Sequence, residues 1–212
     1  MKDQASIVII GGGIAGCSIA LHLAQMGRTD VILLDKGELT SGSTWHAAGM
    51  VTQFHTSPTL MRMRIYSVEH YRQLTAETGG AAGWHEVGSL RVAASKDHFK
   101  FLQRQISQAK ALGMNVEMIS PAQALNIFPQ MSGDNLFGAL HIPGDGHVNP
   151  SDITMEIARR AKALGVTIVT GVRVTGIERG PRGEVTAVNT EQGRIKTEIV
   201  VNAAGMWGRQ VG

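Results

Sequence analysis

The segment SIVIIGGGIAGCSIALHLAQMG, residues 6–27, constrains the fold of this chain more than any other part of the sequence. Its β-branched run SIVII is typical of a strand, and three consecutive glycines break it. The apolar residues that follow recur at helical spacing, with Ile14, Cys17, Leu21 and Ala24 along one face. The segment therefore predicts a strand, a tight turn and a helix, which is the opening of an α/β domain.

Residues 5–26 carry no formal charge, and such a stretch can also belong to a signal peptide or a short membrane span. The glycines interrupt it in the middle, and no Ala-x-Ala-like cleavage site follows an apolar core. We therefore expect no membrane span. Cys17 is the only cysteine, so an intrachain disulfide framework is excluded, and a reducing compartment, the cytoplasm, is expected.

The charge pattern gives little reason to expect nucleic acid as a partner. The 212 residues include 20 basic and 17 acidic side chains, a net charge of +3, and no basic block. Hydrophobic residues make up 43% of the chain, which is typical of a globular protein. A chain of this length can bury a sizeable core in one or two domains.

The glycines follow the pattern Gly11-x-Gly13-x-x-Gly16 directly after the predicted strand. In a dinucleotide-binding turn, the first allows the sharp bend, the second lets a pyrophosphate approach, and the third lets the helix pack on the strand. A second apolar run, VILLD, ends at Asp35, where a carboxylate would hold the ribose hydroxyls of adenosine. We therefore predict a dinucleotide site. The alternative is a glycine turn with a capping acid in an ordinary α/β protein.

Three further features favour FAD over NAD as the dinucleotide. A loop rich in Gly, Ser and Thr follows Asp35 and suits a second phosphate and a ribityl chain. Residues 50–150 form a large insertion that is not Rossmann-like, whereas an NAD domain normally proceeds at once to its third parallel strand. The last apolar run, IVVNAAG, ends in small residues at Gly205, where bulk beside a cofactor would clash. An NAD-dependent dehydrogenase is kept as an alternative.

The rest of the chain alternates helical and strand patterns. We expect helices over residues 59–78, 97–112, 121–128 and 152–164, the last capped by Ser151. We expect strands within residues 89–95, 115–120, 136–142, 166–178, 184–190 and 193–205. The predicted fold class is therefore α/β: a Rossmann-like parallel sheet with a β-meander, and part of a mixed α+β domain inserted after the second strand.

Four stretches carry a family resemblance: IVIIGGGIAGCSIALHLAQMG, DVILLDKGELTSGSTWHAAGMV, PGDGHVNPSDIT and IVVNAAGMWGRQVG. The chain resembles the flavin-dependent amine oxidoreductases of the D-amino acid oxidase superfamily, most of all the dimethylglycine dehydrogenase and sarcosine dehydrogenase branch. The second stretch is specific to that branch. The resemblance implies a GR2-type FAD-binding domain made of residues 1–50 and 150–212, with residues 51–149 as the inserted part of a substrate domain.

The resemblance also implies which residues contact FAD. Together with the glycine pattern, the predicted cofactor-binding residues are Gly11, Gly13, Ile14, Ala15, Gly16, Asp35, Lys36, Gly42, Ser43, Thr44, Trp45, His46, Ala47, Ala48, Gly49, Met50, Val174, Gly205 and Trp207. In that branch the histidine of the STWHAAG motif is bonded covalently to the 8α-methyl carbon of the flavin, and by position this residue is His46. No catalytic residue is assigned.

The covalent role of His46 has a plain alternative. A neutral imidazole nitrogen is a nucleophile, and small neighbouring residues let this loop lie close to the flavin. A lone histidine more often hydrogen-bonds to a neighbouring carbonyl and packs. Trp45 is expected to pack beside the flavin rather than to react.

The resemblance implies oxidation of a small N-methylated, secondary or tertiary amine, of the sarcosine or dimethylglycine type, by hydride transfer to the flavin. The electron acceptor would be oxygen or an electron-transfer flavoprotein. Members of the branch continue past NAAGMWGRQVG, so we expect the C-terminal remainder of the family fold to be absent. A tetrahydrofolate site would lie only in that missing region. The alternative is a FAD-binding fragment or split-enzyme subunit without activity of its own.

No metal site is expected from the other reactive residues. His85, His141 and His147 lack cysteine partners and the His-x-x-x-His spacing of a helical zinc site. Cys17 lies on the predicted sheet-facing side of the first helix, where we expect it to pack as a small hydrophobe.

Overall fold

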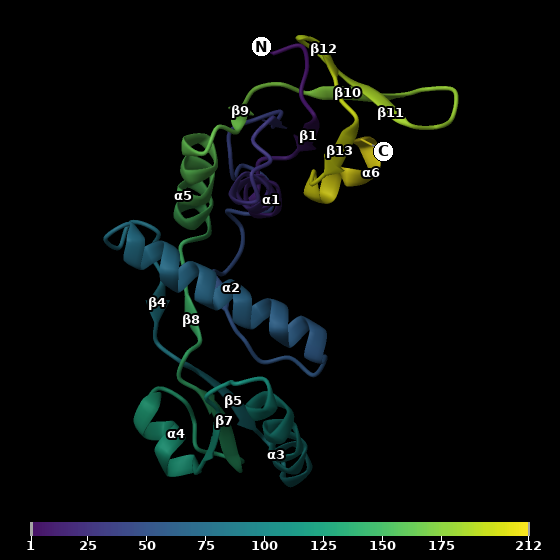
Figure 1. The fold of residues 1–212 in the computed structure, drawn as a ribbon. Coiled ribbons are helices and arrows are strands. Elements are labelled where there is room, and N and C mark those ends of the chain that lie inside the picture. The colour runs from purple at the N-terminus through teal and green to yellow at the C-terminus, as the bar shows by residue number, and fades with distance from the viewer. Residues whose placement is uncertain (1, 212) are drawn as a thin grey trace. The chain divides into compact units, whose positions relative to one another are not determined.

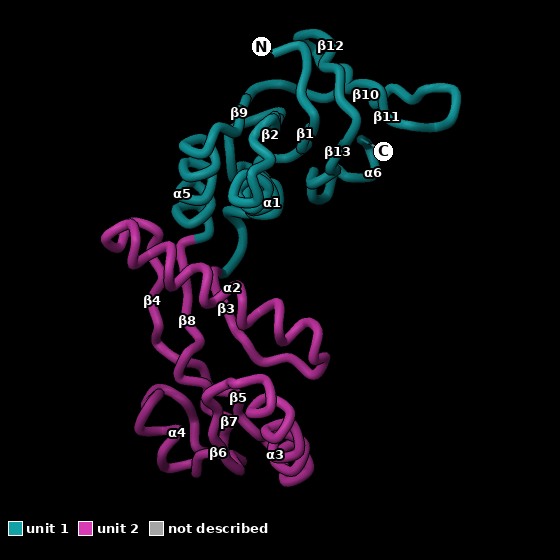
Figure 2. The backbone as a smooth tube through the Cα atoms, in the orientation of Figure 1, with its two compact units in different colours: residues 1–48, 150–212 teal, residues 49–149 magenta. Residues whose placement is uncertain are grey.

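The computed structural model describes residues 2–211 of the chain (Figure 1). The chain divides into two compact units: unit 1 consists of residues 1–48 and 150–212, and unit 2 of residues 49–149 (Figure 2). The chain therefore leaves unit 1 once, after its first two strands, and returns to it once.

Unit 1 is built on a parallel sheet with the strand order β13-β1-β2-β9. These strands are β1 (Ile7–Ile10), β2 (Val31–Leu34), β9 (Thr167–Val169) and β13 (Ile199–Asn202). Every residue of β1 and β2 is buried, as is typical of parallel strands covered on both faces. Ile10 is paired with Leu34 on one side and with Asn202 on the other, so three strand ends meet at one edge of the sheet.

Helix α1 (Ile14–Gln25) connects β1 to β2, as the opening segment predicts. Its buried residues include Cys17 and Leu21, two of the positions expected along the apolar face. Helix α5 (Pro150–Ala163) packs against α1 and leads into β9. The strand–turn–helix prediction is confirmed. None of the helices within residues 2–211 combines the length and the hydropathy that crossing a bilayer requires.

A three-stranded antiparallel meander completes unit 1, as predicted. It consists of β10 (Val174–Arg179), β11 (Val185–Thr190) and β12 (Gly193–Lys196). Val188 and Ile195 of the meander are fully buried and share one apolar cluster with residues of β1 and β2. The meander therefore covers part of one face of the parallel sheet.

Unit 2 is the mixed α+β part that the sequence predicts. Its two antiparallel sheets have the orders β5-β7-β6 and β3-β8-β4. The strands are β3 (Met50–Val51), β4 (His85–Glu86), β5 (Ser89–Ala93), β6 (Glu117–Ile119), β7 (Gly138–Ile142) and β8 (Gly146–His147). The helices are α2 (Pro58–Glu77), α3 (Lys96–Ala111) and α4 (Pro121–Ile127). Phe54, Met61 and Leu140 lie in its apolar core.

One predicted helix cap is wrong. Ser151 is expected to cap the last long helix, but α5 already begins at Pro150, so Ser151 lies inside the first turn. Proline fits the first helical position because its fixed φ matches the helix and its missing N–H would have no intrahelical partner there. The Thr154 hydroxyl donates to the Pro150 carbonyl at 2.7 Å, which satisfies a group of this first turn.

The last strand is shorter than predicted. β13 ends at Asn202, whereas the sequence predicts strand up to Gly205. Ala204 is already out of the extended conformation, with a φ of −75° and a ψ of 14°, and Gly205 follows with a φ of +56°, a left-handed conformation that glycine adopts without strain. The chain continues as a 3₁₀ helix, η1 (Gly205–Trp207), and the helix α6 (Gly208–Val211).

Gly16, in the first turn of α1, packs directly on the turn that precedes the helix. A Cβ atom on Gly16 would overlap the backbone carbonyl of Gly11. We expect Gly16→Ala to lower the free energy of unfolding by about 3 kcal/mol, a typical cost of overpacking a rigid site. Gly176→Ala in β10 is the matched control, since an added Cβ there meets nothing within 4 Å. Urea unfolding followed by circular dichroism measures both variants. Equal unfolding midpoints for the two would contradict this role of Gly16.

Candidate functional site

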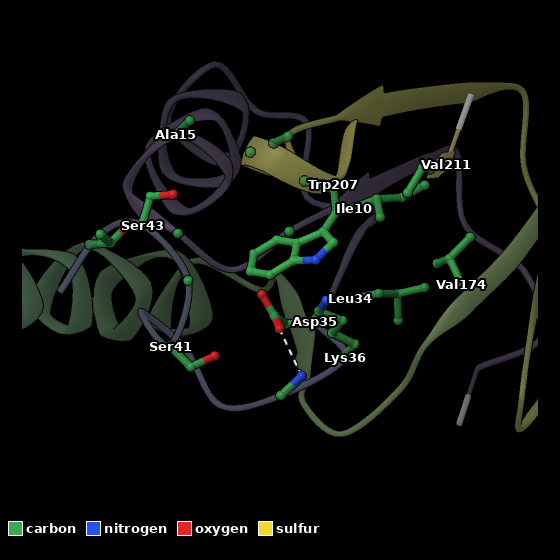
Figure 3. Close-up of a pocket in the computed structure, with 18 of the residues that line it drawn as sticks. Ile10, Ala15, Leu34, Asp35, Lys36, Ser41, Ser43, Val174, Trp207 and Val211 are labelled. Carbon is green, nitrogen blue, oxygen red and sulfur yellow. Dashed lines mark hydrogen bonds between the residues drawn. The ribbon is translucent and has the colours of Figure 1, made fainter. Parts of the chain in front are cut away.

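A cavity of about 550 Å³ lies at the carboxyl ends of β1, β2 and β13 (Figure 3). Open parallel sheets bind ligands at this edge, and the volume is in the range of small-molecule sites. All of the lining residues belong to unit 1: Ile10, Gly11, Gly13, Ile14, Ala15, Leu34, Asp35, Lys36, Gly37, Ser41, Gly42, Ser43, Thr44, Val172, Arg173, Val174, Ala203, Ala204, Gly205, Trp207, Gln210 and Val211.

The turn between β1 and α1 is packed so closely that it requires glycines. Gly11 has a φ of +114°, and a Cβ atom there would overlap the Ala203 carbonyl group. A Cβ atom on Gly13 would lie 2.9 Å from the Thr44 hydroxyl oxygen. That oxygen accepts the Ile14 N–H at 3.1 Å, which fixes the loop after β2 against the start of α1.

The start of α1 also offers hydrogen-bond donors to a ligand. The N–H groups of Gly13 and Ala15, two residues of the cavity wall, have no acceptor among the residues that the structure describes. Unpaired amides at a helix N-terminus, together with the positive end of the helix dipole, form a ready anion site. The turn therefore fits the pyrophosphate of a dinucleotide.

Asp35 joins two loops of the cavity through its carboxylate. One oxygen accepts the Gly12 N–H at 2.6 Å, and the other accepts the Gly37 N–H at 2.8 Å. Each carboxylate oxygen has a further lone pair, and Asp35 is part of the cavity wall (Figure 3). The side chain can therefore accept ribose hydroxyls while it keeps both amide bonds.

Trp207 contributes an aromatic ring to the cavity wall, beside Asp35 and Lys36 (Figure 3). The Lys36 ammonium nitrogen lies 3.6 Å from the centroid of the indole ring, a close cation–π contact. A Cβ atom on Gly42 would lie 3.2 Å from the same ring. The indole ring therefore packs against the loop after β2, and the absence of a side chain at Gly42 leaves room for it.

His46 is exposed and is held by a local hydrogen bond. Its Nδ1 lies 3.0 Å from the Gly42 carbonyl oxygen. A carbonyl oxygen only accepts, so Nδ1 carries the proton in this bond, and the neutral form of this ring has its lone pair on Nε2. Trp45, which is 57% exposed as a residue, has its ring centroid 3.9 Å from that of the imidazole. The hydrogen bond matches the plain alternative for His46, but the imidazole is not packed in a core.

The cavity wall brings together most, but not all, of the residues that the sequence predicts to bind a cofactor. Those that line it are Gly11, Gly13, Ile14, Ala15, Asp35, Lys36, Gly42, Ser43, Thr44, Val174, Gly205 and Trp207. Gly16 packs behind the turn against Gly11. Those of the loop that are exposed and outside the wall are Trp45, His46, Ala47 and Ala48. Gly49 and Met50 belong to unit 2.

Several lining residues were missed. Ile10 and Leu34 are the last residues of the predicted strands β1 and β2, so the carboxyl-end rule for parallel sheets could have found them. Gln210 and Val211 follow Trp207 at positions i+3 and i+4, the spacing that places residues on one side of a helix. The remaining missed residues are Gly37, Ser41, Val172, Arg173, Ala203 and Ala204, for which only proximity to predicted site residues gave a signal.

The one cysteine, Cys17, is buried in unit 1. Burial, and to a smaller degree the Asp35 charge, raises the pKa of the Cys17 thiol to about 12. Its Sγ donates to the Gly12 carbonyl at 3.6 Å, so the prediction that Cys17 packs as a small hydrophobe is confirmed. Within residues 2–211, no three His, Cys, Asp or Glu side chains gather as metal ligands do.

Comparison with known families shows to which family the chain belongs. Residues 6–212 match the family described as FAD dependent oxidoreductase (DAO). The chain belongs to this family. The NAD-dependent dehydrogenase alternative is therefore wrong. The match also agrees with the glycine turn, the acid after β2 and the helix N-terminus, which together fit the adenosine and pyrophosphate parts of FAD.

Individual relatives show to which branch of the family the chain is similar. The chain is 40% identical over 211 residues to mitochondrial dimethylglycine dehydrogenase of Rattus norvegicus, and 37% identical over 218 residues to mitochondrial sarcosine dehydrogenase of Homo sapiens. Both matches cover 100% of this chain and 24% of the relative, so the chain spans about a quarter of their length. The predicted branch of the superfamily is confirmed.

A solved structure supports the fold assignment. The crystal structure of L-proline dehydrogenase from P. horikoshii matches this chain with a TM-score of 0.94 and 29% sequence identity. The match covers 100% of this chain and 55% of the other. The predicted FAD-binding, Rossmann-like fold class is confirmed.

Removal of the Asp35 carboxylate should weaken cofactor binding. We expect Asp35→Ala to raise the dissociation constant of FAD at least about tenfold, since each charge-assisted hydrogen bond contributes about 1.5–3 kcal/mol. Asp30→Ala is the matched control, because the Asp30 carboxylate binds Ser6 at the other end of β2, outside the cavity wall. Flavin fluorescence during titration of the apoprotein measures both. An unchanged constant for Asp35→Ala would remove this carboxylate from the site.

Proposed function

We propose that this chain binds FAD in the cavity of unit 1 and that the whole protein oxidises an N-methylated amino acid of the dimethylglycine or sarcosine type. The observation that carries the proposal is the glycine turn with its unpaired amides beside Asp35, at the edge where three parallel strands end. The two relatives named above, a dimethylglycine dehydrogenase and a sarcosine dehydrogenase, support the substrate class.

The chemistry of the cavity wall suggests how each part of FAD is held. The Gly13 and Ala15 amides would bind the pyrophosphate. Asp35 would accept the ribose hydroxyls, and its negative charge disfavours a 2′-phosphate on that ribose. Val174 and the Trp207 ring would contact the adenosine half through apolar and aromatic surface. The domain assignment follows: unit 1 is the FAD-binding domain, and unit 2 is part of the substrate domain.

When bound, FAD supplies the acceptor for a hydride from the carbon attached to the amine nitrogen. The residues of the cavity wall would bind FAD and orient it. Ile10, Leu34 and Val172 present apolar surface to the cavity, which keeps water away from the bound cofactor. The amine must be neutral to give up a hydride, so a pocket of low dielectric, which lowers the pKa of an amine, favours the reaction.

We further propose that His46 forms the covalent bond to the flavin. Its hydrogen bond to the Gly42 carbonyl places a proton on Nδ1, so the neutral imidazole has a lone pair on Nε2 for bonding to the 8α-methyl carbon. The new C–N bond would replace one C–H bond of the methyl group: the proton would leave to solvent, and the two electrons would reduce the flavin, which the electron acceptor of the enzyme would reoxidise. No other side chain of SGSTWHAAG is a comparable nucleophile, because serine and threonine hydroxyls need a neighbouring base. The exposure of the imidazole leaves it accessible.

Acid precipitation tests the covalent bond. We expect FAD to stay with the polypeptide of the whole protein after acid treatment, and His46→Ala to release it into the supernatant. His98→Ala, which removes an exposed histidine of α3, should retain the flavin and serves as the control. Mass spectrometry of the tryptic peptide that contains His46 gives the direct reading. A peptide without added flavin mass, from protein that holds FAD, would leave His46 with its hydrogen-bonding role alone.

Anaerobic reduction tests the reaction. We expect dimethylglycine or sarcosine to bleach the oxidised flavin band of the whole protein, and N,N,N-trimethylglycine to leave it unchanged because its nitrogen has no lone pair. Stopped-flow absorbance measures the rate. If flavin bands are present but no N-methylated glycine bleaches them, the protein is a FAD-binding component without this activity, which was the alternative from the sequence.

A further inference from the structure

Two imidazoles and a thioether lie side by side on the small sheet β3-β8-β4 of unit 2. His147, on the central strand β8, is paired with Met50 of β3 on one side and with His85 of β4 on the other. Residues directly opposite each other in antiparallel strands point to the same face of the sheet, with Cβ atoms about 4.5–5.5 Å apart. The sheet therefore gathers three side chains that can bind a metal ion, all of them from unit 2.

The two imidazoles are available to a ligand. Met50, His85 and His147 are all exposed, Met50 by 73%. In the part of the chain that the structure describes, no hydrogen bond or ion pair engages the ring of His85 or of His147. His141 has the opposite arrangement, because its Nδ1 lies 3.2 Å from the Glu117 carboxylate. Each ring of the pair therefore offers a nitrogen lone pair in its neutral form.

The separation of the two rings fits coordination of one shared ion. The centroids of the His85 and His147 rings are 5.0 Å apart, and the ring planes are tilted by 32°. Two imidazoles on one ion, with metal–nitrogen bonds of about 2.0–2.1 Å at angles between about 90° and 110°, have centroids about 4.5–5.2 Å apart. The observed separation lies inside this range, so a shared ion needs rotation of the rings but no change in the spacing of the strands.

The donor atoms select copper among the common metal ions. Imidazole binds copper, zinc and nickel, whereas the soft thioether of methionine selects Cu(I) and is not a usual zinc ligand. Within residues 2–211, no third His, Cys, Asp or Glu side chain joins the two histidines as a metal ligand. Glu86, the carboxylate next to His85, is paired with Arg72. Ions that require several oxygen ligands, such as Mg²⁺ and Ca²⁺, therefore do not fit this face.

We propose that His85 and His147 bind one copper ion on the exposed face of β3-β8-β4, and that the Met50 thioether is a third ligand when the ion is Cu(I). Cu(II) is held by the two imidazoles and by water, which together supply the nitrogen and oxygen ligands that it prefers. An ion on an exposed sheet face needs no cavity, and none of the three residues lines the cavity of unit 1. The inference therefore does not rest on the proposed function.

Titration of the whole protein, without an affinity tag, with copper(II) sulfate tests the two histidines. We expect one Cu(II) per chain, with an electron paramagnetic resonance spectrum that shows coupling to two imidazole nitrogens, and weaker binding of zinc sulfate, following the usual order of metal affinities. His85→Gln and His147→Gln should each weaken Cu(II) at least about tenfold and leave one coupled nitrogen, because one arm of the chelate is lost. His98→Gln, at an exposed position of α3, should bind Cu(II) like the wild type.

Reduction of the bound ion with ascorbate tests the thioether. X-ray absorption should then show a sulfur ligand on Cu(I), and Met50→Leu should remove it. Competition with bicinchoninate should show Cu(I) bound at least about tenfold more weakly in Met50→Leu, with Cu(II) affinity unchanged, because the soft ligand favours the reduced ion. Met63→Leu, which replaces another exposed methionine, on α2, should leave both affinities unchanged.

Two further readings keep a lost site separate from a lost fold. Circular dichroism checks each variant, and in the unmodified protein Cu(II) should broaden the amide NMR signals around His85 and His147 before any others. The inference is overturned if the wild type binds no copper, if the broadened signals lie elsewhere, or if His98→Gln weakens Cu(II) as much as the other two glutamine variants do. Unchanged Cu(I) affinity in Met50→Leu would remove the thioether from the site and overturn the assignment to Cu(I).

Discussion

The carboxylate of Asp35 joins the segments on which the cavity depends. Its two oxygens accept the Gly12 and Gly37 amides, and its backbone bonds to the carbonyl of Val169 and the N–H of Val172. One residue thus links the turn before α1, the loop after β2 and the chain that leaves β9. Bonds to an ionised acceptor are about twice as strong as neutral ones, so this junction fixes the cavity wall before any ligand arrives.

The sequence predicted the frame of unit 1 because local signals there agree with one another. A β-branched run, three glycines and a helical period each point to the same strand, turn and helix over residues 6–27. The sequence is ambiguous at the start of α5, and there the predicted helix cap is wrong. Ser151 and Pro150 are both acceptable at a helix start, and only the backbone conformation showed that the proline lies inside the helix.

The sequence predicts only part of the site, because many of its contacts join residues that are far apart along the chain. The spacing of Asp35 from the glycines indicated a ribose acid, but its bonds to Gly12 and Gly37 depend on how two loops fold. The same limit holds in unit 2, outside the cavity: Arg64 lies on α2 and Arg91 on β5, and nothing in the sequence indicates that both donate to the Phe54 carbonyl.

The strand order of unit 1 also has a consequence for how the chain acquires its structure during synthesis. β1, α1 and β2 are neighbours in sequence and can associate early, but Ile7 pairs with Ile199, and Ile32 pairs with Thr167. Both edges of the nascent two-stranded core therefore stay unpaired while unit 2 is being made. Contacts between such distant residues form slowly, and open edges of buried, apolar strands invite pairing with other chains. Until β9 and β13 emerge, two buried, apolar strand edges are therefore open to pairing with other chains.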